Sequence, residues 1–183
     1  MDSWHPEWSR RWRPVLLALL VTTGSFASPG QPAGEPEPIL VVQGAVQQRL
    51  LLDREALGKL SWREFSEVRQ FGQGAAAEQV TVRYQGVPLR EILDQAVLAP
   101  DRRAVRRAVV VLTAKDGYQT VFSWGELYNS RLGEGVILVR GEDDRDLLRD
   151  DGGPALRSLY DIRSGPRHVR WLQKIEVLLV DGT

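Results

Sequence analysis

The chain contains no cysteine, and it has only one methionine and two histidines among its 183 residues. Without a thiol it can build no disulfide, iron–sulfur cluster, thiol nucleophile, lipidated cysteine anchor or cysteine-ligated metal site of its own. An excess of positive charge is also lacking, because 24 basic side chains are balanced by 24 acidic ones. Nucleic-acid surfaces need clustered Lys and Arg, so we expect no nucleic-acid partner. The length and the 43% hydrophobic content fit one globular domain.

The apolar run from Val15 to Val21 is too short to span a membrane, which takes about 20 apolar residues. Three arginines between positions 10 and 13 precede it, and the small residues of Ser25-Phe26-Ala27 follow it. A basic start, a short apolar stretch and small residues before the cleavage point are typical of a secretory signal peptide, here residues 1–27. We therefore expect a periplasmic or secreted protein without a membrane span after cleavage; an uncleaved anchor is the alternative.

Arg10-Arg11 does not make a twin-arginine signal, because Arg13 and Pro14 occupy positions that such a signal fills with apolar residues. We therefore expect export in the unfolded state, before any cofactor is loaded. Residues 28–38 hold four prolines and two glycines and are predicted to form a flexible tether. The mature domain, residues 39–183, keeps one histidine, His168, and so cannot build a histidine-cluster metal site.

The hydrophobic pattern predicts short strands mixed with short helices, without regular alternation of the two. This mixture indicates an α+β domain with a single core. Strands are expected at 39–46 with a break at Gly44, and at 80–84, 109–113, 118–122, 136–139 and 169–180; helices are expected at 54–60 after the N-cap Asp53, at 87–97 with Pro88 in its first turn, and at 123–128.

Two short motifs and one acidic stretch complete the local predictions. Asp116-Gly117 predicts a tight hairpin with positive φ at both central positions. The spacing of Ser61 and Glu64 matches a capping box and predicts a second short helical turn, and the same spacing recurs at Ser123. Residues 142–151 are expected to form a solvated loop, and they lack the ligand spacing of an EF-hand calcium site.

We assign no catalytic residue and no metal ligand from the sequence. It contains neither a glycine-rich phosphate loop nor a Gly-x-Ser-x-Gly elbow. Many carboxylates are present, but their spacing singles out no pair for acid–base chemistry. One basic and aromatic cluster remains as a candidate binding site, and it surrounds the turn at Gly165-Pro166.

This cluster comprises Arg163, Arg167, His168, Arg170 and Trp171. Successive arginines can direct their planar guanidinium groups at an anion, and a tryptophan face can line a pocket. The pattern therefore predicts a site for a small anionic ligand, such as one that bears a phosphate. The alternative is an exposed strand face whose arginines pair with the acidic residues of 143–151.

The order of motifs resembles the oxidoreductase molybdopterin-binding domain of the sulfite oxidase family, over nearly all of residues 39–180. The resemblance implies that family's fold, with mixed β-sheets and short helices in a single domain. Active members hold a molybdenum–pterin cofactor and often perform sulfite or sulfoxide redox chemistry. The motifs that carry the resemblance are Leu40-Val-Val-Gln-Gly-Ala-Val46, Leu52-Asp-Arg-Glu-Ala-Leu57, Tyr84-Gln-Gly-Val-Pro-Leu-Arg-Glu-Ile-Leu93, Ala114-Lys-Asp-Gly-Tyr118, Phe122-Ser-Trp-Gly-Glu-Leu127, Val136-Ile-Leu-Val139, Gly153-Pro-Ala-Leu-Arg157 and Gly165-Pro-Arg-His-Val-Arg-Trp-Leu-Gln-Lys-Ile-Glu-Val177.

The resemblance implies that Arg167, His168 and Arg170 lie where active members contact the pterin or its phosphate. It also implies a cysteine ligand to molybdenum between the first helix and the Gly-Val-Pro-Leu segment, yet residues 65–82 contain none. A thiolate is a soft, strongly donating ligand, and no Ser or Gln in this stretch is an evident substitute.

We therefore expect no bound cofactor and a non-catalytic module that binds a small ligand or an exported protein partner. The alternative is a molybdopterin-dependent oxidoreductase with an atypical ligand set or a partner subunit.

Overall fold

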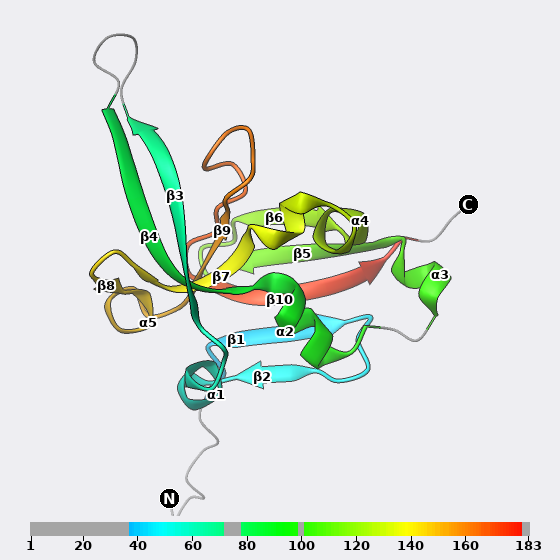
Figure 1. Cartoon of the computed structure of the whole chain (residues 1–183). Coiled ribbons are helices and arrows are strands. Elements are labelled where there is room, and N and C mark those ends of the chain that lie inside the picture. The colour runs from blue at the N-terminus through cyan, green and yellow to red at the C-terminus, as the bar shows by residue number, and fades with distance from the viewer. Residues whose placement is uncertain (1–36, 72–77, 99–100, 181–183) are drawn as a thin grey trace, which may run out of the picture. The chain divides into compact units, whose positions relative to one another are not determined.

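The computed structural model describes residues 37–71, 78–98 and 101–180. The expected signal peptide and the expected tether up to position 36 lie outside these residues. Among the helices that are described, none has the length and apolar character needed to cross a membrane. The described part has two β-sheets and several short helices (Figure 1), which confirms the predicted mixed α+β fold.

The first sheet has five strands in the order β2-β1-β10-β5-β6. β1 and β10 are parallel, and the other neighbours are antiparallel. Along β5 every second residue is buried, so one face of the sheet packs on the core and the other faces solvent. The strands are β1 (Leu40–Gly44), β2 (Leu50–Leu52), β5 (Ala108–Ala114), β6 (Gln119–Ser123) and β10 (Leu172–Leu179).

The second sheet is built around β7, which pairs with β4 on one side and with β8 and β9 on the other. Residues 78–83 of β4 pair with β3 alone, so β3 and β4 form a long hairpin (Figure 1). The strands are β3 (Arg63–Phe71), β4 (Glu78–Pro88), β7 (Val136–Glu142), β8 (Arg145–Asp146) and β9 (Ala155–Ser158).

Short helices connect the strands. α2 has its apolar residues at helical spacing, and all four of them are buried in the main core. The helices are α1 (Arg54–Gly58), α2 (Leu89–Ala96), α3 (Arg102–Val105), α4 (Trp124–Tyr128) and α5 (Leu147–Asp150), with a 3₁₀ turn η2 (Arg131–Glu134).

β7 lies between two hydrophobic clusters. Val136 and Leu138 pack into the main core with the first sheet and α2, whereas Ile137 and Val139 pack into a smaller cluster with Tyr84. Successive residues of a strand point to opposite faces, so both faces of β7 are buried. This accounts for four consecutive apolar residues in the strand.

Several local predictions are confirmed because neighbouring groups determine them. Asp53 caps α1, with its Oδ1 accepting from the Ala56 amide at 2.8 Å. Ser123 and Glu126 form the predicted capping box of α4. Gly44 ends β1 with φ of +97°, and a Cβ there would lie 2.2 Å from the Val177 carbonyl oxygen. Only glycine fits this position, because it accepts positive φ and leaves room for the neighbouring backbone.

Four local predictions are wrong, each because longer-range pairing or packing prevails. The predicted turn at Ser61 gives way to β3, which starts at Arg63 and pairs with β4. β4 continues through a register shift to Pro88, so α2 starts one residue later than Pro88. Residues 142–151 contain β8 and α5, and α5 is held by two buried leucines. In the Asp116-Gly117 hairpin only Gly117 has positive φ, because the turn is wider than predicted.

Candidate functional site

The predicted Arg167, His168 and Arg170 lie in the segment between β9 and β10, residues 159–171. Near its C-terminal end, backbone hydrogen bonds hold this segment against β9. The Val169 amide donates to the Leu156 carbonyl at 3.0 Å, and the Leu156 amide donates to the Val169 carbonyl at 2.7 Å. The three side chains contact different groups, which are described in turn.

Arg167 is held by two carboxylates. Its Nε donates to Asp161 Oδ2 at 2.9 Å and its Nη1 donates to Glu126 Oε1 at 2.8 Å, while Nη2 also contacts Asp161. The guanidinium lies over the Phe122 ring, 4.5 Å from its centroid. Burial disfavours ionisation of Glu126, yet hydrogen bonds from Ser123 and Arg167 outweigh it and lower the pKa of Glu126. The positive charge of Arg167 is therefore compensated within the chain.

His168 points toward β9. Its Nε2 lies 3.4 Å from the carbonyl oxygen of Ser158. Burial lowers the pKa of His168, and the positive charge of Arg157 lowers it further. The imidazole is therefore neutral at pH 7 and does not act there as a cation toward an anionic ligand.

Arg170 is largely exposed. Its Nη2 lies 3.9 Å from Asp151 Oδ2, and its guanidinium lies 4.9 Å from the centroid of the Trp171 ring. Asp151 also accepts from Arg145 at 2.6 Å. Arg170 thus pairs with the acidic stretch, as the alternative interpretation of the cluster predicted, whereas Arg167 does not.

Trp171 marks the point where the chain leaves one sheet for the other. Its φ is +51°, in the left-handed region that is unfavourable for a bulky residue. Val169 forms an isolated bridge to Leu156 of the second sheet, and Leu172 begins β10 of the first sheet. The strained residue therefore redirects the backbone between the sheets.

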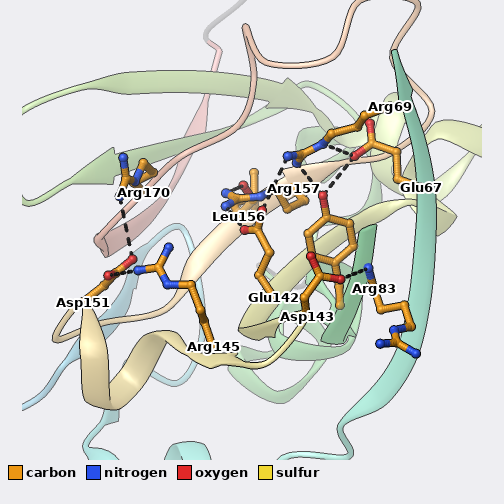
Figure 2. Close-up of polar contacts among 11 residues, drawn as sticks. Glu67, Arg69, Arg83, Glu142, Asp143, Arg145, Asp151, Leu156, Arg157 and Arg170 are labelled. Atoms are coloured by element: carbon orange, nitrogen blue, oxygen red, sulfur yellow. Dashed lines mark hydrogen bonds and ion pairs between the residues drawn. The ribbon is translucent and has the colours of Figure 1, made fainter. Parts of the chain in front are cut away.

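A different set of charged residues, which the sequence motifs did not predict, meets between the strands of the second sheet. This buried ionic cluster consists of Glu67, Arg69, Tyr84, Glu142 and Arg157, from strands β3, β4, β7 and β9 (Figure 2). Arg157 Nη2 donates to Glu142 Oε2 at 2.5 Å, and only 8% of the Arg157 side chain is exposed. Arg69 Nη1 donates to the other oxygen of Glu142 at 3.4 Å and its Nε to Glu67 at 2.9 Å.

Tyr84 connects the two halves of the buried ionic cluster. Its hydroxyl donates to Glu67 at 3.0 Å and accepts from Arg69. Burial raises the pKa of Tyr84, so the phenol stays protonated and remains a donor. Burial also opposes ionisation of Glu67, but hydrogen bonds from Arg69 and Tyr84 prevail and lower the pKa of Glu67. Two arginines and two carboxylates therefore balance in charge.

Two buried polar atoms of β9 have no partner among the described residues: Nε of Arg157, which belongs to this cluster, and Oγ of Ser158, the next residue along the strand. A buried polar atom without a hydrogen bond costs free energy, and such atoms commonly face a water or a ligand. The nearby His168 ring already contacts the Ser158 carbonyl. Arg157 Nε is therefore a buried donor of the cluster that no described residue accepts from.

Comparison with known proteins assigns the family. Residues 40–181 match the model of the oxidoreductase molybdopterin-binding domain, and the chain belongs to this family. The chain is similar in fold to the sulfane dehydrogenase SoxCD from Paracoccus pantotrophus, with a TM-score of 0.56 and 16% sequence identity. That match covers 76% of this chain and 37% of the other, so this chain spans well under half of the protein it matches. No curated protein matches the chain.

The residues present do not fit the molybdenum of the family's cofactor. The chain has no cysteine to supply a thiolate. Of the segment in which the resemblance places that ligand, residues 65–71 and 78–82 lie on β3 and β4, which pair in unbroken register from Arg63 opposite Gly86 to Phe71 opposite Glu78, and residues 72–77 lie outside the described part. Within the described part of the chain no three His, Cys, Asp or Glu residues come together to hold a metal ion. The donor set that a soft, thiolate-bound metal requires is therefore missing.

Proposed function

We propose that this chain is a non-catalytic member of the molybdopterin-binding domain family. In this proposal the chain binds a small anionic ligand or an exported protein partner. The observation that carries the proposal is the missing thiolate, together with the buried ionic cluster. Glu142 and Glu67 neutralise Arg157 and Arg69, which would otherwise be cations available to a phosphate-bearing cofactor. Arg167 is likewise neutralised by Asp161 and Glu126.

Export supports the same proposal. The sequence of residues 1–27 has the basic, apolar and small-residue regions of a signal peptide. Because the twin-arginine pattern is absent, the chain is expected to cross the membrane unfolded and to fold without a preloaded cofactor. Cell fractionation followed by N-terminal sequencing tests this step, and we expect a periplasmic or secreted protein that begins at Ser28. A cytoplasmic protein that retains Met1 would contradict it.

Metal and pterin analysis of the protein purified from its native host tests the missing redox function. We expect no stoichiometric molybdenum by mass spectrometry and no pterin fluorescence after denaturation. A cysteine-containing molybdenum enzyme of the same host, purified in parallel, shows that the cofactor was available. Stoichiometric molybdenum in this protein would overturn the proposal.

The alternative is a molybdopterin-dependent oxidoreductase with atypical ligation or a partner subunit. The unpartnered Arg157 Nε and Ser158 Oγ favour it, because buried donors of this kind could face a bound pterin. Under this alternative the purified protein carries pterin, and Ser158→Ala lowers the pterin content. Under the leading proposal Ser158→Ala leaves the pterin content at zero.

A further inference from the structure

The surface beside Arg167, which is held by its two ion pairs, forms a hollow. A hollow of about 530 Å³ opens there, and its lining combines apolar side chains with arginines. Tyr160 is 58% exposed and Ile162 is fully exposed, although burial of a large apolar side chain is favourable by about 1.5–3 kcal/mol. We call this the arginine-rimmed hollow; it is lined by Leu132, Tyr160, Asp161, Ile162, Arg163, Pro166 and Arg167.

The walls of the arginine-rimmed hollow are held in place by neighbouring elements. The Tyr160 ring packs on Gly135, where a Cβ would come within 2.7 Å of the ring, and the Leu159 amide donates to the Gly135 carbonyl at 2.9 Å. On the other side the Tyr118 hydroxyl donates to the Pro166 carbonyl oxygen. A partner would therefore meet a surface that is already ordered, which reduces the entropic cost of binding.

The lining of the arginine-rimmed hollow carries one net positive charge, that of Arg163, for which no ion pair is found among the described residues. Arg167 and Asp161 compensate each other, and Arg167 also pairs with Glu126. Arg163 is exposed and has no ion-pair partner among the described residues. Tyr160 also lines a second hollow together with Arg131 and Glu134, which carry opposite charges. Arg163 is thus the cation that a bound carboxylate would meet.

We propose that the arginine-rimmed hollow docks an acidic peptide segment of a protein partner, with one large apolar side chain inserted beside Tyr160 and Ile162 and a carboxylate paired with Arg163. Exposed Tyr and Arg next to an apolar pocket are the residue types that contribute most to protein interfaces. The uncompensated charge of Arg163 favours a carboxylate at the matching position of the partner. The inference rests on the binding role proposed above and names the class of partner for it.

Fluorescence anisotropy with labelled peptides tests the docking site. The probe is Asp-Glu-Ile-Phe-Asp-Glu, and the two comparison peptides are the charge-reversed Lys-Arg-Ile-Phe-Lys-Arg and the apolar-free Asp-Glu-Gly-Ser-Asp-Glu. We expect the probe to bind about tenfold or more tightly than either comparison peptide. Equal binding of all three, or no binding of the probe, would overturn the proposal.

Matched variants locate the site. We expect Ile162→Asp and Arg163→Glu each to weaken probe binding by about tenfold. The controls are Val121→Asp, at a 52% exposed valine on the first sheet, and Arg49→Glu at another exposed arginine, and neither should change binding. Circular dichroism checks that every variant folds. If the controls weaken binding as much as the site variants do, the hollow is not the site.

The Ile162→Asp variant also tests two other possible occupants of the hollow, a second copy of the chain and a lipid surface. A concentration-dependent dimer in sedimentation that Ile162→Asp abolishes would assign the hollow to a second copy. Binding to phosphatidylglycerol vesicles that Ile162→Asp abolishes, without peptide binding, would assign it to a lipid surface. Either result overturns the peptide proposal. Metal analysis decides the non-catalytic role independently, because bound molybdenum would remove that role and leave the peptide titration unchanged.

Discussion

Arg157 on β9 and Glu142 on β7 form an ion pair across 2.5 Å, although only 8% of the Arg157 side chain is exposed. Glu142 also binds Arg69 at 3.4 Å, so one carboxylate serves two arginines from different strands. Removing one partner from a buried pair leaves an uncompensated charge, which costs far more than the intact pair contributes. The stability of the second sheet therefore depends on Glu142.

The first prediction concerns Glu142→Gln. The amide keeps the shape but leaves Arg157 and Arg69 without their shared carboxylate. We expect the free energy of unfolding to fall by about 2–4 kcal/mol, with allowance for the partial exposure of Glu142. Urea denaturation measures the change. Glu55→Gln is the control, because its pair with Lys59 is exposed and should have no measurable effect. Equal effects of both variants would refute the role of Glu142.

Local signals made part of the fold predictable. Asp53 and Ser123 could be recognised as caps because a cap depends on residues within three positions, and Gly44 because a turn depends on its own backbone. The predicted turn at Ser61 failed because pairing of β3 with β4 outweighed the capping spacing. Local propensity is weak when a long antiparallel partner is available.

The site was harder to predict because its contacts join distant parts of the sequence. Glu142 pairs with Arg69, 73 residues away, and Arg167 pairs with Glu126, 41 residues away. The arginine cluster and the acidic stretch that pairs with Arg170 were visible in the sequence, but the carboxylates that compensate Arg167 were not. A sequence signal for the buried ionic cluster did exist: Glu67 and Arg69 are two residues apart, so on a strand they share one face. That Arg167, His168 and Arg170 contact a cofactor or ligand stays a prediction.

The second prediction concerns pH. The pKa of His168 is lowered in the folded protein by burial and by Arg157, so below about pH 6.5 the unfolded chain binds a proton more readily than the folded one. Stability should therefore be full above that pH and decline as the pH drops below it. His168→Gln should flatten this part of the profile. The pKa values of Glu67 and Glu126 are also lowered in the folded protein. Their contribution to the stability of the protein is lost only in the lower range near pH 4.

Chemical denaturation across this range measures the effect of His168. It is the only histidine in residues 28–183, so measurements on a chain that begins at Ser28 contain no other imidazole. An identical decline in wild type and His168→Gln would show that His168 titrates alike in the folded and unfolded states, contrary to the prediction.

The third prediction separates steric from conformational cost at two glycines. Gly44 and Gly152 both have positive φ, +97° and +76°, but a Cβ at Gly44 meets the Val177 carbonyl oxygen at 2.2 Å whereas one at Gly152 meets nothing within 4 Å. Gly152→Ala should cost about 1 kcal/mol from backbone strain alone. Gly44→Ala should cost at least about 3 kcal/mol, because β1 and β10 must also move apart. Thermal unfolding compares the two variants, and equal costs would contradict the predicted clash.

The fourth prediction compares the two arginines that the sequence placed in one site. Arg167 binds Glu126 and Asp161 and covers Phe122, whereas Arg170 is mostly exposed and 3.9 Å from Asp151. Arg167→Ala should lower the free energy of unfolding by about 1–3 kcal/mol, because it removes the arginine donor from Asp161 and from Oε1 of Glu126. Arg170→Ala should change it by less than about 0.5 kcal/mol. Arg167→Lys should not restore stability, because an ammonium cannot replace the planar fork that reaches both acids. If urea denaturation shows Arg167→Ala to be as harmless as Arg170→Ala, the two ion pairs contribute nothing, and Arg167 is available to an anionic ligand after all.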